Sequence, residues 1–189
     1  MVAARSPHFV PYEEFLAMEE ASEGRHEWVD GVVYAMSRGT PEHGRLTGRV
    51  IGLVLTPLLA EGCELFASDT PIFIEAARHH TYADASSVCG PLVTRTMHDK
   101  NGRSIGDAIV NPTLIVEVLS EGTERYDRDG KFEAYKKIPS FREYVLGSQA
   151  ERRIEVRTLH EGVWTTLIAG EGETIRIHGR DMAVDTIYK

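Results

Sequence analysis

The chain has 189 residues, of which 42% are hydrophobic and 26% are charged. A chain of this length can bury a substantial core, so we expect one domain spanning residues 1–189. This composition excludes a wholly disordered or fibrous protein. The net charge of −8 disfavours charge-driven, nonspecific binding of nucleic acid, so such binding would need a local patch or a bound cation.

The apolar runs and the cysteines bear on the cellular compartment in which the protein is expected. The longest apolar run, residues 50–60, is too short for a bilayer and is interrupted by glycine, threonine and proline. The first ten residues lack the apolar core of a signal peptide. We therefore expect a cytoplasmic protein with no membrane contact. Cys63 and Cys89 lack CxxC spacing, and in a reducing cytoplasm we expect two small core residues rather than a disulfide.

Helices and strands are predicted in an irregular order along the chain. Three helices are expected: one opened by Pro11 and ended by Gly24, one from Thr40 to Gly62 with a kink at Pro57, and one over 123–137. Strands are expected in a hairpin about Asp30-Gly31 and at 64–67, 71–75, 82–89, 114–119, 142–146, 153–159, 164–168 and 174–177. The polar stretch 90–111 is predicted to be a long loop. Without regular βαβ alternation, this order predicts an α+β or mixed α/β fold with a central sheet flanked by helices.

Two carboxylates stand out against this pattern. Glu117 lies within the apolar run Leu114–Leu119, and an unpaired buried carboxylate costs several kcal/mol. A lysine, an arginine, backbone donors or a metal ion must compensate it, and a purely structural ion pair is one alternative. Asp84 is a second carboxylate on a predicted strand, where an ordinary turn or edge aspartate is the alternative. Two inward carboxylates on neighbouring strands would suit Mg²⁺ or Mn²⁺.

Other polar groups are less informative. Asp127, Lys131 and Tyr135 form one stripe on the third predicted helix. The stripe either faces solvent or places a lysine over the strand carboxylates. His43 lies near the start of the second helix, where a cap or surface role is usual. The His79-His80 pair lacks zinc-helix spacing, and no GxSxG, P-loop or GxGxxG motif is present.

Taken in order, these residues resemble a bacterial family. The matching strings are His26-Glu27-Trp28-Val29-Asp30-Gly31, Ala35-Met36-Ser37, His43, Ala83-Asp84, Leu114–Ser120, and the spaced set Thr123, Asp127, Lys131 and Tyr135. The pattern is similar to that of the Uma family of restriction-endonuclease-like proteins, within the PD-(D/E)XK nuclease superfamily. The resemblance covers about residues 12–146. Two departures are Ala83 in place of proline and Val145-Leu146-Gly147 in place of "Wlvd".

The resemblance implies a restriction-endonuclease-like mixed sheet and a set of site residues. Asp84, Glu117 and Lys131 would be catalytic. Asp84, Glu117 and the backbone carbonyl of Val118 would bind the metal, with Glu27 as a further candidate ligand; His43, Asp127 and Tyr135 would support them. The superfamily lysine expected two residues after Glu117 is replaced by Leu119, so Lys131 would act from the following helix.

The implied activity is hydrolysis of DNA phosphodiester bonds with Mg²⁺ or Mn²⁺ as cofactor. Two alternatives remain: a noncatalytic nucleic-acid- or protein-binding domain that keeps the nuclease fold, and a scaffold with a structural salt-bridge cluster. Because one short chain brings one centre, cleavage of both strands of a duplex predicts a homodimer. Residues 153–177 are the expected surface, since they lie outside the motif.

Overall fold

The computed structural model describes residues 9–37 and 39–189, and its strands form two six-stranded sheets and a two-stranded ribbon. The strands are β1 (His26–Val29), β2 (Val32–Ala35), β3 (Cys63–Ala67), β4 (Pro71–Ile74), β5 (His79–Tyr82), β6 (Ala85–Cys89), β7 (Thr94–His98), β8 (Ser104–Ile109), β9 (Leu114–Leu119), β10 (Glu143–Ser148), β11 (Arg153–His160), β12 (Val163–Gly170), β13 (Thr174–Ile177) and β14 (Arg180–Ala183). The α-helices are α1 (Tyr12–Ala21), α2 (Pro41–Val50), α3 (Phe132–Tyr135) and α4 (Val184–Tyr188).

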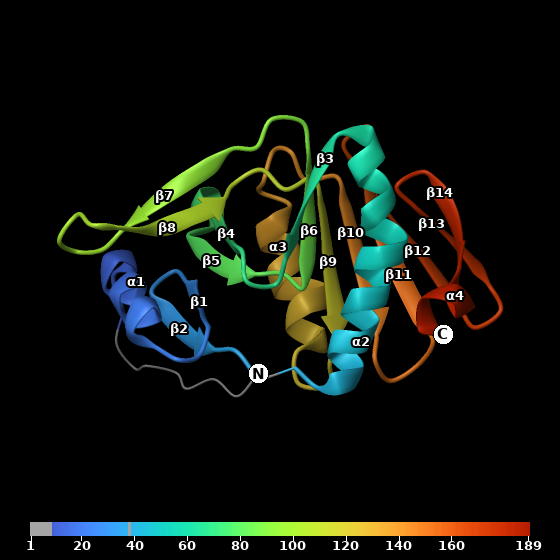
Figure 1. Cartoon of the computed structure of the whole chain (residues 1–189), viewed down its shortest axis with the longest axis horizontal. Helices are drawn as coiled ribbons and strands as arrows, with labels where there is room; N and C mark the ends of the chain where they lie inside the picture. The colour runs from blue at the N-terminus through green and yellow to red at the C-terminus, as the bar shows by residue number, and fades with distance from the viewer. Residues whose placement is uncertain (1–8, 38) are drawn as a thin grey trace.

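The two sheets lie side by side as two lobes (Figure 1). The first sheet has the order β2-β1-β5-β4-β8-β7, and the central sheet has the order β12-β11-β10-β9-β6-β3. The remaining strands, β13 and β14, form the ribbon. The mixed α+β class is confirmed, although the strands expected in one sheet are divided between two.

Strand β9 lies at the centre of the molecule, parallel to β10 and antiparallel to β6. All six of its residues are buried, and alternate residues face opposite sides of the sheet. Val116 and its even-numbered neighbours pack into a core with α2 and α4, whereas Ile115 and Leu119 pack with α3 and β4. Glu117 therefore points to the α3 side.

The predicted second helix changes its hydrogen bonding along its length. Thr40 caps α2 by accepting a hydrogen bond from the backbone of His43 at 3.1 Å. After Val50 the chain continues as a π-helical turn, Ile51–Leu55, and a 3₁₀-helix, Thr56–Glu61. Gly62 ends it with φ of 81°, as the sequence predicts. The irregularity begins before Pro57, because the proline ring interferes with the preceding turn.

Two parts of the predicted secondary structure are wrong. Residues 90–111 are not a loop, since β7 and β8 form a hairpin there. Most side chains of this hairpin are exposed and polar, so its sequence lacks the alternation of apolar and polar residues that indicates a strand. The segment 82–89 is not one strand, because the chain bends at Ala83-Asp84 and passes from the first sheet to the central sheet. The third predicted helix is present, although its middle part, Tyr126–Lys131, is π-helical before α3. Strand β14 and helix α4 were not foreseen.

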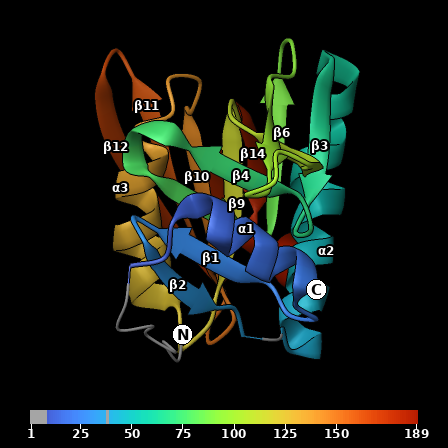
Figure 2. The same ribbon diagram turned by 90° about the vertical axis from the view of Figure 1, so that its left-hand side faces the viewer.

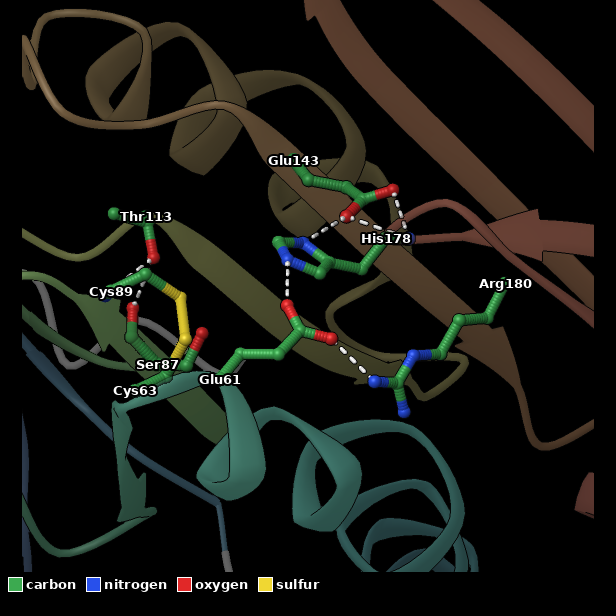
Figure 3. The surroundings of a disulfide bond; sticks show 8 residues. All are labelled: Glu61, Cys63, Ser87, Cys89, Thr113, Glu143, His178 and Arg180. Atoms are coloured by element: carbon green, nitrogen blue, oxygen red, sulfur yellow. Dashed lines mark hydrogen bonds and ion pairs between the residues drawn. A yellow bond between two sulfur atoms is a disulfide. The ribbon is translucent and has the colours of Figure 1, made fainter.

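The prediction of two reduced cysteines is also wrong. Cys63 and Cys89 lie directly opposite each other on antiparallel strands β3 and β6 and form a disulfide (Figure 3). Beside it, Glu61 contacts Arg180 and His178 and so ties the end of the second helical segment to the β13–β14 ribbon (Figure 3). The cysteines are 26 residues apart, and only strand pairing brings them together.

No helix among the described residues is long and apolar enough to cross a membrane.

Candidate active site

A cleft of about 510 Å³ opens between the two sheets. The β1–β2 hairpin, the start of α2 and the end of β9 supply its walls. Residues that line the walls include Arg25, Tyr34, Met36, Ser37, Thr40, His43, Ser120, Thr123 and Gln149, and those that line its inner part include Glu27, Asp84, Glu117, Asp127 and Lys131. The structure thus brings the predicted site residues from distant parts of the chain to one open cavity.

Four buried side chains surround the ammonium group of Lys131; together with Lys131 we call them the Lys131 cluster, which comprises Glu27, Glu117, Asp127, Lys131 and Tyr135. The Nζ atom lies 3.1 Å from Oε1 of Glu27, 3.1 Å from Oε1 of Glu117 and 3.6 Å from Oδ1 of Asp127. It also donates a hydrogen bond to the carbonyl of Tyr82 at 3.0 Å. The Tyr135 hydroxyl donates to the same oxygen of Glu117 at 2.9 Å.

The position of Lys131 decides between the two orientations left open for its helix. The stripe of Asp127, Lys131 and Tyr135 faces inward, and all three side chains are buried. Leu119, which stands where the superfamily has its lysine, packs instead in the apolar core with Phe132 and Tyr144. An ammonium group therefore reaches Glu117 from the helix and not from the strand.

Burial and charge oppose each other in this cluster. Desolvation raises the pKa of Glu117 well above its usual value; Lys131 counteracts this effect, whereas Asp127 and Asp84 add to it. Desolvation also opposes ionisation of Glu27, but Lys131, His79 and the Thr81 hydroxyl outweigh it and lower the pKa. The ammonium of Lys131 is disfavoured by burial, yet Glu117 and Glu27 keep its pKa well above the usual value. Lys131 is therefore charged, and Glu27 is its ionised partner.

Asp84 occupies the bend between β5 and β6, next to the pair Ala85–Val116. Its Oδ2 atom accepts a hydrogen bond from the backbone N–H of Val118 at 2.6 Å and lies 3.1 Å from Nε2 of His43. The hydrogen bond to Asp84 raises the pKa of His43 despite partial burial. Asp84 and His43 are only half-buried, so this pair is the more accessible part of the site.

A further layer of polar side chains holds the cluster, and the sequence analysis did not single it out for this role. The Thr81 hydroxyl donates to Glu27 at 2.5 Å, and the Tyr144 hydroxyl donates to the backbone carbonyl of Asp127 at 2.9 Å. Tyr126 hydrogen-bonds Nε2 of His79 at 3.0 Å. Threonine and tyrosine are common in strands and cores, so no local pattern marks these residues.

The carboxylate side chains of this site are oxygen donors, the type of ligand that a divalent cation such as Mg²⁺ prefers. Among residues 9–37 and 39–189, no three His, Cys, Asp or Glu side chains stand ready as metal ligands. The chemistry nevertheless fits a hard cation, since three buried carboxylates share one ammonium and Oε2 of Glu27 has no hydrogen-bond partner. Both hydrogen bonds accepted by Glu117 end on Oε1, which leaves Oε2 for another ligand.

Comparisons with known proteins show the family of the chain. The model of the Uma2 family, described as "Putative restriction endonuclease", matches residues 12–180. The protein slr1290 of Synechocystis sp. PCC 6803 is 34% identical over 182 residues, which cover 94% of this chain and 90% of that protein. A second protein of the same organism, sll1609, is 29% identical over 143 residues, covering 75% of this chain and 76% of the relative.

A solved structure shares the fold. The crystal structure described as a putative nuclease belonging to DUF820, from Anabaena variabilis, superimposes with a TM-score of 0.72. The match covers 96% of this chain and 98% of the other, at 14% sequence identity.

Proposed function

Since the chain belongs to the Uma2 family of restriction-endonuclease-like proteins, we propose that it is a divalent-metal-dependent endonuclease that hydrolyses phosphodiester bonds of DNA. The observation that carries the proposal is the open cleft in which Asp84 and the Lys131 cluster meet. A closed cluster would suit a scaffold, but four of the five residues of this one line an open cavity. Because each chain brings one centre, we also propose that two copies act on a duplex.

Asp84, Glu117 and the backbone carbonyl of Val118 would hold Mg²⁺ or Mn²⁺, with Glu27 as a further ligand. Such a cation supplies Lewis-acid stabilisation of the scissile phosphate and lowers the pKa of water. The oxygen donors are of the type that these cations prefer. A cation here would also offset the repulsion between the carboxylates and the phosphate backbone.

The protein's own residues position the reacting groups. Lys131 and Tyr135 both donate to Oε1 of Glu117 and so fix the orientation of that carboxylate. An ammonium group has three hydrogens, and Lys131 has three near partners, Glu27, Glu117 and the Tyr82 carbonyl. We therefore assign Lys131 to orienting Glu117 and balancing its charge, rather than to donating directly to water.

His43 and Asp84 occupy the more accessible part of the site. Because Asp84 raises the pKa of His43, the imidazolium is populated over more of the neutral range and adds a positive charge facing the phosphate. The cap that Thr40 gives to α2 holds His43 in the first turn of the helix. This pair would help to bind the substrate backbone at the point of cleavage.

The test is cleavage of supercoiled plasmid and of single- and double-stranded DNA and RNA oligonucleotides, with Mg²⁺, Mn²⁺ or EDTA. We expect cleavage of DNA that depends on the cation. Glu117→Gln and Asp84→Asn should each lower the rate by at least about 10²-fold. Glu133→Gln is the matched control, because Glu133 is an exposed carboxylate on α3 and its loss should leave the rate unchanged.

The assay also separates the alternatives. No cleavage with either cation, together with retained binding of DNA, would favour a noncatalytic nucleic-acid-binding domain. Cleavage of RNA but not DNA would overturn the substrate assignment alone. Equal activity in Glu117→Gln and in the unmodified protein would place the chemistry outside this cleft.

A further inference from the structure

Strand β12 forms an open edge of the central sheet. It lies at one margin of that sheet, with β3 at the other (Figure 2). It is eight residues long and carries no charged side chain. Val163 is 62% exposed and Leu167 53% exposed on one face, and Ile168 is 52% exposed on the other.

The other edges of the two six-stranded sheets, in the described part of the chain, are protected in ordinary ways. Strand β7 carries Arg95 and His98, and β3 carries Glu64. Strand β2 is only four residues long. Charges and short length are the usual devices by which proteins prevent edge-to-edge pairing. Because β12 has neither, its open edge is suited to pairing.

We propose that β12 pairs in antiparallel fashion with β12 of a second copy of this chain. A twofold axis perpendicular to the sheet joins two such edges into one continuous sheet, and the contact is self-complementary. With Thr165 on the axis, Val163 lies opposite Leu167 of the second copy. The paired residues carry no charge, and Glu161 lies outside the strand in the β11–β12 turn, so no like charges meet across the contact.

The geometry also sets the strength of the dimer. In this register residues 163–167 of the two strands overlap, which is about 17 Å of extended chain, and the outward-pointing backbone groups of residues 164 and 166 give about four interchain hydrogen bonds. Such a strip is narrow compared with the roughly 800 Å² per partner of a stable interface. We therefore expect a weak dimer whose population rises with concentration. The pairing does not depend on nuclease activity, so either proposal can fail while the other stands.

The first test measures molar mass by sedimentation velocity over a concentration series. The unmodified chain should shift from 21.1 kDa towards twice that mass. Leu167→Lys should weaken the association at least tenfold, because an ammonium would replace a buried methyl contact. Leu59→Lys is the matched control, since Leu59 is a leucine of equal exposure, 54%, outside β12; association should be unchanged. Circular dichroism and thermal unfolding check that both variants fold.

The second test reads the register. Directly opposite residues of antiparallel strands have Cα atoms about 4.5–5.5 Å apart, within the range that a disulfide spans. Thr165→Cys should therefore form a covalent dimer on mild oxidation, seen by nonreducing electrophoresis. Thr94→Cys, on the charged edge strand β7, should stay monomeric.

Any one of the following three results would overturn the proposal, as would a fourth given below. The three are a chain that stays at monomer mass at the highest soluble concentration, a dimer that Leu167→Lys leaves intact, and a Thr165→Cys chain that does not cross-link. A monomer that instead binds a synthetic strand peptide would likewise overturn it, by showing that the edge accepts a different partner.

Discussion

The strongest consequence of the structure concerns the removal of a single charge, in the variant Lys131→Met. Methionine keeps the apolar stem of the side chain and removes only the ammonium group. Glu27 and Glu117, both buried, then lose the cation that lies 3.1 Å from each. Either a charge stays unpaired in the core or a carboxylate takes up a proton, and both outcomes destabilise the folded protein at neutral pH.

The magnitude follows from the burial of the pair. Removal of one partner of a buried ion pair costs about 3–5 kcal/mol, against roughly 5–15 kcal/mol for the whole stability of a domain. The loss should be greater at pH 8 than at pH 5. In the unmodified protein Lys131 lowers the pKa of Glu27 below its usual value, so the stabilisation by this pairing is complete at both pH values and is lost only in more acidic solution. In the variant burial alone acts on the two carboxylates and raises their pKa, so protonation relieves part of the cost at pH 5.

The assay is urea unfolding followed by the fluorescence of Trp28 and Trp164. Lys136→Met is the control, because Lys136 is exposed and pairs with an exposed glutamate; its loss should cost under about 1 kcal/mol. Adding Glu27→Gln to Lys131→Met should recover part of the loss, since it removes the uncompensated carboxylate. A loss below about 1 kcal/mol for Lys131→Met at pH 7 would refute the reasoning.

Three further predictions follow from the same structure. Burial lowers the pKa of His79 and of His80 to about 4. The stability that their neutral forms give to the folded protein is therefore complete above pH 6.5 and is lost as pH falls towards 4, up to roughly 3 kcal/mol for each histidine. Urea unfolding that gave equal stabilities at pH 7.5 and pH 5 would contradict this. Because burial raises the pKa of Glu117, binding of Mn²⁺ should release protons. The heat of Mn²⁺ binding measured by calorimetry should then differ between buffers of different ionisation enthalpy. Equal heats in these buffers would argue against proton release. Dithiothreitol should lower stability by up to about 3.5 kcal/mol, since the disulfide bridges residues 26 apart; an unchanged melting temperature would show that the bond contributes little.

Local features of the fold could be predicted because each depends on a few adjacent residues. Asp30 and Gly31 have positive φ values of 45° and 90° in the β1–β2 turn, as an Asp-Gly pair favours. Thr40 caps α2, and Gly62 ends the helical segment. The apolar run around Glu117 is the buried strand β9. The β7–β8 hairpin was missed because most of its side chains are exposed, so burial imposes little pattern on its sequence.

The residues of the candidate site could be identified from their types and their order in the sequence, but their arrangement in space could not be predicted. Glu117 had to have a compensating partner, because a lone buried carboxylate is too costly; that requirement was evident from the strand alone. Which group compensates it depends on the direction in which the helix bearing Lys131 packs, and both directions satisfy the same spacing. The Thr81 and Tyr144 hydroxyls that complete the site come from other strands, and nothing in their neighbours along the chain marks them.

By itself, the sequence determined the family, the α+β class, the main local elements and the set of carboxylates from which a site could be made. Only the tertiary structure decided that the strands divide into two sheets, that Lys131 turns inward, that Cys63 meets Cys89, and that β12 lies at an open edge. The physical reason is the range of the interactions. Turns, caps and hydrophobic periodicity act over a few residues, whereas sheet pairing and the balance of buried charge join segments that are far apart in the chain.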